Sequence, residues 1–169
     1  MWREAAGGVL LQWTAMSMNV TPGGSRGQRT PPEPLKQVLL WFMRTAHRLG
    51  ARRLDGMPVV SLTTRGARSG ELRTSPVMSF PDGESAWLVV ASFGGSARHP
   101  AWFINMARHP GEVWVDIEGR RVRVTPSTLD GEARERAWER ITARSRRFAE
   151  YQQKTDREIP VVRLAAEPS

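Results

Sequence analysis

Residues 58–80 read PVVSLTTRGARSGELRTSPVMSF, and this stretch decides the fold. A run rich in β-branched residues, 58–64, and a second strand-like run, 74–80, flank a loop that is bounded by Gly66 and Gly70. β-Branched runs that are interrupted by turn residues are typical of strands. The stretch therefore predicts two neighbouring strands joined by a short loop.

The same strand and turn signals continue along the rest of the chain. Further strand-like runs occupy residues 85–93, 112–117, 120–125 and 159–164. Apolar periodicity and cap residues predict helices over residues 34–49, 100–109 and 130–153. Six strands with helices at the edges indicate an α+β chain that is mainly β, folded as a small antiparallel barrel.

The N-terminal part of the chain differs in composition from the rest. Residues 19–33 read NVTPGGSRGQRTPPE, which is rich in Pro and Gly and typical of a linker. We expect residues 1–33 to be a flexible N-terminal extension and residues 34–169 to form one folded domain.

Gly23-Gly24-Ser25-Arg26-Gly27 matches the G-x-S-x-G pattern of hydrolases, but no strand precedes it and no helix follows it, so we interpret it as a chance match.

Composition excludes several kinds of chemistry. The chain has 169 residues and no Cys, which excludes disulfides, thiolate metal sites and Cys nucleophiles. Its three His lack metal-ligand spacing, so we expect no metal. The net charge is +8 and 23 of the 25 cations are Arg, a residue that suits phosphate and carboxylate ligands, although codon usage explains the bias equally well. Without a helix-turn-helix signal, we expect no nucleic-acid partner.

Two segments carry the chemistry of a binding site. Residues 65–76 combine three Arg, two Gly and three hydroxyl residues, a set that favours a bound anion; a solvated loop is the alternative. In residues 91–105 a Gly-Gly loop enters a helix N-terminus, which is a second place for an anion. There Trp102 and Phe103 suit a planar ring and Asn105 suits its polar edge, unless these aromatic residues belong to the core.

Three segments resemble one family: LTTRGARSGELRTSP (62–76), SAWLVVASFGG followed by HPAWFINM (85–106), and EYQQKTDREIPVVRL (150–164). They are similar to the L-T-T-x-G-R-K-S-G-x-x-R-x-x-P, A-S-x-G-G-x-x-x-x-P-x-W-x-x-N and Y-Q-x-x-T-D-R-x-I-P motifs of the deazaflavin-dependent nitroreductase/quinone reductase family. The resemblance implies a split β-barrel of the FMN-binding type. It implies an enzyme that passes a hydride from reduced coenzyme F-420, an 8-hydroxy-5-deazaflavin with a phosphate and an oligoglutamate tail, to a quinone, nitroaromatic, enone or imine.

The resemblance also assigns site residues. Cofactor contacts fall on Ala67, Arg68, Ser69, Arg73, Thr74, Ser75, Pro76, Val77, Met78, Val90, Ala91, Ser92, Phe93, Ala101, Trp102, Phe103, Ile104 and Asn105. The substrate is expected against Phe148 and Tyr151, and the hydroxyl of Tyr151 or Ser92 is expected to stabilise or protonate the reduced acceptor.

This sequence departs from the family pattern at a few of these positions. Ala67 stands where the family usually has Arg, and Phe93 where it usually has Lys, which predicts fewer cationic contacts to the cofactor. Ser145 and Phe148 replace aromatic hydroxyls, which predicts a different acceptor. Two alternatives remain at this point: FMN in place of the deazaflavin, and a cofactor-free barrel that binds a lipid or pigment.

The sequence says less about the partners and the localisation of the protein than about its binding site. We expect a small-molecule substrate and a cytoplasmic protein, and the apolar patch near the N-terminus leaves peripheral membrane association open. A row of Arg at 136, 140, 144 and 147 is either a solvated helix face or a guide for the glutamate tail. The oligomeric state is not predicted.

Overall fold

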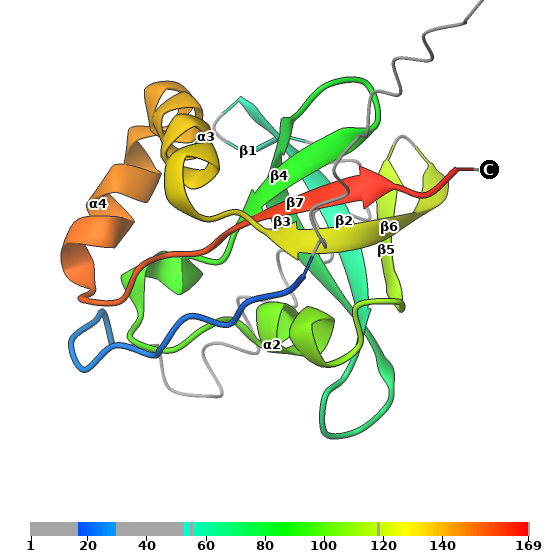
Figure 1. Cartoon of the computed structure of the whole chain (residues 1–169), viewed down its shortest axis with the longest axis horizontal. Coiled ribbons are helices and arrows are strands. Elements are labelled where there is room, and N and C mark those ends of the chain that lie inside the picture. Colours follow the sequence, from blue (N-terminus) through cyan, green and yellow to red (C-terminus); the bar gives the residue numbers. More distant parts are fainter. Residues whose placement is uncertain (1–16, 30–52, 55, 118, 169) are drawn as a thin grey trace, which may run out of the picture.

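The computed structural model describes residues 17–29, 53–54, 56–117 and 119–168. The helix predicted over residues 34–49 lies outside these residues. Within them, the chain forms an antiparallel barrel with helices packed on its outside (Figure 1), which confirms the predicted fold class.

Six strands form the barrel, in the order β2-β3-β4-β7-β6-β5, and β5 pairs with β2 to close it. They are β2 (Met57–Arg65), β3 (Leu72–Pro81), β4 (Ala86–Val90), β5 (Val113–Ile117), β6 (Arg120–Thr128) and β7 (Val161–Ala166). A two-residue strand, β1 (Arg53–Leu54), pairs with the start of β2.

The barrel is split because two of its strands change partners midway. β3 pairs with β2 up to Met78 and with β4 from Ser79 onward. In the same way β6 pairs with β5 and then, from Val124, with β7. Residues 72–78 of β3 therefore pair with β2 alone among the strands described. Pro76, which has no N–H to donate, suits this half of the strand.

Two hydrophobic cores hold the fold. One fills the barrel and contains Leu62, Val89 and Val115 together with Phe103 from the helix α2 (Ala101–Arg108). The other lies between the outside of the barrel and two further helices; its buried side chains include Phe80, Leu88, Ile141, Phe148 and Ile159.

These two helices, α3 (Gly131–Arg144) and α4 (Arg146–Lys154), lie on the same side of the barrel (Figure 1). The prediction of one continuous helix over residues 130–153 was wrong at Ser145, whose backbone is extended (φ −147°, ψ 97°). The interruption turns α4 so that Phe148 meets Phe80 edge to face, with ring centroids 5.7 Å apart. The burial of Phe148 thus has more influence on the backbone here than the helical periodicity of the sequence does.

The predicted strand 85–93 also ends early, at Val90. The chain turns there into a short 3-10 helix, η1 (Phe93–Gly95), in which Gly94 and Gly95 adopt left-handed φ values of 66° and 81°. A side chain at Gly95 would approach the Tyr151 carbonyl oxygen to 2.7 Å, so glycine is required on both counts.

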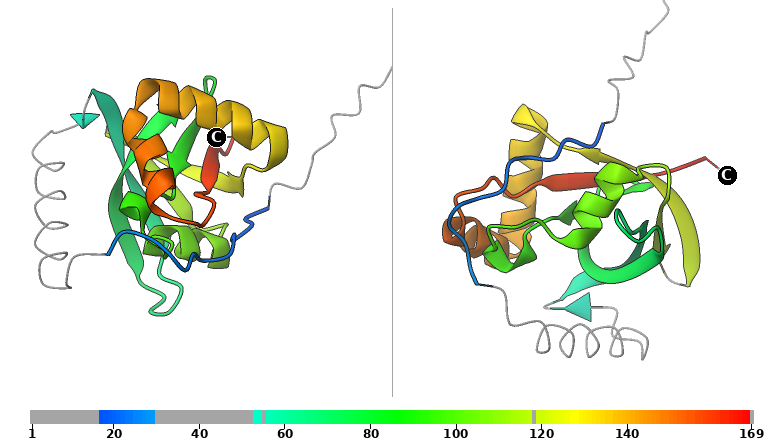
Figure 2. Two further views of the ribbon diagram at one scale, coloured as in Figure 1. Left: turned by 90° about the vertical axis from the view of Figure 1, so that its left-hand side faces the viewer. Right: turned by 90° about the horizontal axis from the view of Figure 1, so that it is seen from below.

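Residues 17–29, called the N-terminal strap from here on, run along the outside of the barrel (Figure 2, blue). The strap begins beside β6, where Thr128 donates its N–H to the Ser17 carbonyl oxygen at 3.2 Å. It ends beside η1, where Gln28 donates its N–H to the Gly95 carbonyl oxygen at 2.8 Å. The proposed division of the chain at residues 33 and 34 stays a prediction.

We predict that Phe148→Ala lowers the free energy of unfolding by about 3–5 kcal/mol, because it empties a buried aromatic site in the second core. Ile104→Ala, at a position that is 38% exposed, should cost less than about 1 kcal/mol. Urea unfolding followed by circular dichroism measures both. Equal losses would show that Phe148 does not act as a core residue.

Candidate functional site

The loop between β2 and β3 is a compact turn with donors on its outside. Gly66 donates its N–H to the Glu71 carbonyl oxygen at 2.8 Å, and Gly70 donates back to Gly66 at 2.9 Å. A Cβ at Gly66 would lie 2.6 Å from Ser69 Oγ and 3.2 Å from the Glu71 carbonyl oxygen, so a larger residue there would require the Ser69 side chain to move.

This closure leaves a set of donors unoccupied. The backbone N–H groups of Arg68 and Ser69 have no acceptor within the residues that the structure describes, and the Arg68 guanidinium there has no partner either. Ser69 Oγ accepts from the Glu71 N–H at 3.3 Å, so its own hydrogen remains available. Two amides, one hydroxyl and one exposed guanidinium suit a phosphate oxygen cluster.

The other two Arg of the loop are neutralised by neighbouring acids. Arg65 Nε donates to Glu112 Oε2 at 2.6 Å, and Arg73 Nη2 donates to Glu71 Oε2 at 2.5 Å. The hydrogen bond between Arg65 and Glu112 raises the pKa of the guanidinium and lowers the pKa of the carboxyl. Arg68 is therefore the cation of this loop that is left for a ligand.

Asn105 fixes the loop to the helix α2. Its Oδ1 accepts the Ala67 N–H at 2.9 Å and its Nδ2 donates to Thr64 Oγ1 at 3.1 Å. Because both amide atoms are used inside the protein and the residue is 8% exposed, Asn105 positions the loop rather than presenting its amide to solvent. The sequence predicted Asn105 as a contact to a ring edge, and that role stays a prediction.

A second candidate region is the segment that runs from β4 to η1. Ser92 is 8% exposed, and its carbonyl oxygen accepts the Gly95 N–H at 3.0 Å. Phe93 has a left-handed φ of 46°, which is uncommon for an aromatic residue. Such a conformation persists only where the surroundings hold it in place.

Arg157 supplies that support, and sequence reasoning missed it. The residue is 3% exposed. Its Nη2 donates to the carbonyl oxygens of Ala91 and Ser92 at 2.9 and 2.8 Å, and its Nε donates to that of Ser96 at 2.8 Å. The T-D-R motif in the sequence was the signal, but a motif does not show which atoms its Arg contacts.

The predicted catalytic hydroxyls lie at this segment and on the neighbouring helix. Tyr151 is half-buried, and its ring lies 6.0 Å from Phe148 and 5.4 Å from Lys154 Nζ. Neither the Tyr151 hydroxyl nor the Ser92 hydroxyl has a hydrogen-bond partner within the described ranges. Both remain available to a ligand, and their catalytic role stays a prediction.

The other predicted residues divide by exposure. Five have side chains buried in the two cores: Val77, Val90, Ala91, Phe103 and Phe148. The partly or fully exposed ones lie on α2 and on the half of β3 that pairs with β2 alone: Ala101, Trp102, Ile104, Thr74, Ser75, Pro76 and Met78.

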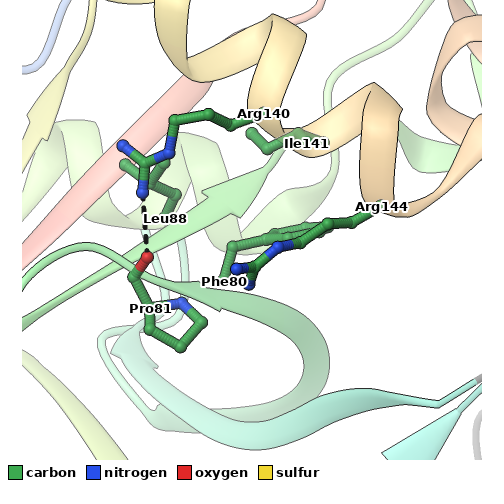
Figure 3. Close-up of a pocket in the computed structure, with 6 residues that line it drawn as sticks. All are labelled: Phe80, Pro81, Leu88, Arg140, Ile141 and Arg144. Atoms are coloured by element: carbon green, nitrogen blue, oxygen red, sulfur yellow. Dashed lines mark hydrogen bonds between the residues drawn. The ribbon is translucent and has the colours of Figure 1, made fainter.

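The Arg row on α3 favours an ordinary solvated face. Arg136 pairs with Glu132, and Arg140 donates to Asp82 Oδ1 at 3.0 Å and to the Pro81 carbonyl oxygen at 3.1 Å. Arg140 and Arg144 line a small, open hollow over Phe80, Leu88 and Ile141 (Figure 3).

Two kinds of feature are absent from the described residues. No group of His, Asp and Glu there has the arrangement of a metal site. None of the helices in the described ranges combines the length and apolar character that a bilayer-spanning helix requires.

Together, these observations define a split barrel with two candidate binding features: the unoccupied donors of the loop between β2 and β3, and the Ser92 and Tyr151 hydroxyls near η1. The sequence profile of the F420H(2)-dependent quinone reductase family matches residues 36–166. The chain belongs to that family.

Individual relatives agree. An F420H(2)-dependent quinone reductase of Mycobacterium tuberculosis is 33% identical over 126 residues, which cover 73% of this chain and 83% of the relative. A solved F420-H2 dependent reductase (FDR-A) is 38% identical with a TM-score of 0.57, over 63% of this chain and 93% of that one. A solved domain-swapped dimer is 34% identical with a TM-score of 0.58, over 78% and 98%. The predicted family, enzyme class and coenzyme are thereby confirmed.

We predict that Arg157→Lys lowers the free energy of unfolding by at least about 2 kcal/mol, because a single ammonium cannot replace a fork that spans three carbonyl groups. Backbone amides of residues 91–96 should also exchange faster with solvent deuterium. Arg98→Lys, on the same segment but exposed, should change stability by less than about 0.5 kcal/mol. Unchanged stability in Arg157→Lys would contradict the support described for Phe93.

Proposed function

We propose that this protein reduces quinones, and other planar electron-poor acceptors such as nitroaromatics, enones and imines, with reduced coenzyme F-420. The observation that carries the proposal is the donor set of Arg68 and Ser69, unoccupied by the described residues and held in place by Asn105. Membership of the F420H(2)-dependent quinone reductase family supports it.

The residues fit the cofactor that the family implies. A phosphate needs several convergent donors, and the loop offers two amides, a hydroxyl and a guanidinium. The half of β3 that pairs with β2 alone begins at this loop, so backbone groups of residues 74–78 have no strand on their second side within the described residues. We assign the phosphate to the loop and the flank of the ring to this edge.

When bound, the reduced cofactor supplies a hydride, and one further proton completes the conversion of a quinone to a hydroquinone. The protein's part is to orient the two partners and to deliver that proton. The Tyr151 and Ser92 hydroxyls are the proposed donors to the developing oxyanion. Arg157 contributes indirectly, because it fixes the backbone that carries Ser92.

We predict that Arg68→Ala weakens coenzyme F-420 binding at least about tenfold, because it removes a charge-assisted contact worth roughly 1.5–3 kcal/mol. Quenching of the fluorescence of Trp87 and Trp102 measures the dissociation constant. Arg120→Ala, an exposed cation at the turn between β5 and β6, should leave it unchanged. The absence of a saturable quench in the wild-type protein would contradict the proposal. A quench with FMN and none with coenzyme F-420 would show that FMN is the cofactor.

We further predict that Tyr151→Phe lowers kcat for quinone reduction while leaving coenzyme F-420 affinity within about twofold, because it removes a proton donor and keeps the ring packing. Oxidation of the reduced cofactor, followed by its absorbance, measures the rate with a quinone and with a nitroaromatic. Equal rates in wild type and variant with both acceptors would exclude Tyr151 as the donor and leave Ser92.

A further inference from the structure

The N-terminal strap lies outside the region that the family profile matches, which starts at residue 36. Its composition is that of a linker, yet residues 17–29 make a continuous series of contacts with the domain. Family membership therefore does not explain the role of the strap, and we infer that role from the contacts that the strap makes.

The strap bonds to the backbone of the segment that follows β4. Gly24 donates its N–H to the Ala97 carbonyl oxygen at 2.9 Å, and Gln28 donates to that of Gly95 at 2.8 Å. Gly95 belongs to η1, and Arg157 donates to the carbonyl oxygens of Ser92 and Ser96, which flank η1. The segment is thus held by both a buried side chain and the strap.

Asp156 anchors the middle of the strap. Its carboxylate accepts the Ser25 hydroxyl at 2.5 Å, the Ser25 N–H at 3.2 Å and the Arg26 N–H at 2.9 Å. These hydrogen bonds, led by that of the Ser25 hydroxyl, lower the pKa of Asp156 from 3.8 to about 2. Their stabilisation is complete above the ordinary pKa and is lost only as the pH falls toward 2, so the anchor is intact at neutral pH.

His99 joins the strap to Arg157. Its Nε2 lies 2.8 Å from the Thr21 carbonyl oxygen, which can only accept, so Nε2 carries the hydrogen. In the neutral ring Nδ1 is then an acceptor, and it faces Arg157 Nη1 at 3.3 Å. Burial, followed by the nearby Arg157 charge, lowers the pKa of His99 and outweighs the opposing contact with Thr21. The neutral ring thus connects both supports of the segment.

The glycines of the strap allow its backbone to lie close to the surface of the domain; we do not infer flexibility from them. A Cβ at Gly27 would collide with the Ala97 backbone nitrogen and lie 2.7 Å from the Ser96 carbonyl carbon. A Cβ at Gly24 would collide with the Asp156 carboxylate. Gly23 is different, because its Cβ would lie 3.6 Å from the Ala97 carbonyl oxygen, an ordinary contact. None of the three has a positive φ, so alanine differs from glycine there through contact alone.

We propose that the strap is a positioning element for coenzyme binding: its docking, through Asp156, His99 and the close approach of Gly27, holds residues 92–97 in the conformation that receives the cofactor. The proposal rests on the proposed function. If the segment binds the cofactor only while the strap is docked, the apparent dissociation constant equals the intrinsic constant divided by the fraction of time that the strap is docked.

The test compares Gly27→Ala with Gly23→Ala in the full-length protein. In Gly27→Ala we expect faster deuterium exchange at the Gly24 and Gln28 amides of the strap and at the Gly95 and Ser96 amides of the segment. The coenzyme F-420 dissociation constant and the KM for its reduced form should rise by the same factor, about tenfold if the strap is docked for a tenth of the time. The kcat should stay unchanged, and Gly23→Ala should match wild type throughout.

Asp156→Asn gives a second route, because it removes the anchoring charge and keeps the side-chain shape. It should reproduce the exchange and KM changes in weaker form. The proposal is overturned if the strap amides of Gly27→Ala exchange freely while the segment amides and the KM stay as in wild type. It is also overturned if the strap amides themselves do not respond, or if kcat falls with an unchanged KM.

A failure of the proposed function has a separate signature. The wild-type protein would then show no binding of coenzyme F-420, whereas deuterium exchange at Gly95 and Ser96 would still report whether the strap holds the segment. Loss of cofactor binding in the wild type together with unresponsive segment amides would overturn both proposals.

Discussion

Arg157 donates hydrogen bonds to three carbonyl groups between residues 91 and 96, and much of the site depends on this buried contact. A buried cation is costly unless its donors are satisfied, and within the described residues Arg157 has no carboxylate partner. Backbone carbonyl dipoles and the ring of His99 take that place. The guanidinium fork can therefore stay in place only while the segment keeps this shape, so fold stability and site geometry are tied to one side chain.

The fold followed from the sequence because strand signals are local. β-Branched runs and glycine turns placed the barrel strands within a few residues, and the family motifs supplied the closure that periodicity cannot show. Errors arose where tertiary contacts prevailed over local preference. Ser145 interrupts a helical pattern so that Phe148 can be buried, and η1 replaces the end of a strand because Arg157 holds the backbone there.

The sequence predicted which residue types form the site, but it did not predict which of those residues are paired with one another or with neighbouring acids. Three Arg in one loop indicated an anion, yet only the structure shows that Arg65 and Arg73 are engaged by Glu112 and Glu71 while Arg68 is not. Composition also did not predict the contacts of the N-terminal strap. Glycine and proline mark both flexible chains and chains that pass close to a surface, and sequence gives no means of separating the two.

The change of partners along β3 has a consequence for association between molecules. A strand that is bonded on one side offers its other side to any strand from another chain, which is a route to aggregation. Here that half of β3 contains Arg73 and Pro76, which lacks a donor, and it adjoins the loop that carries Arg68. Proline and charged side chains at this edge thus discourage a second copy of the protein from adding a strand to it.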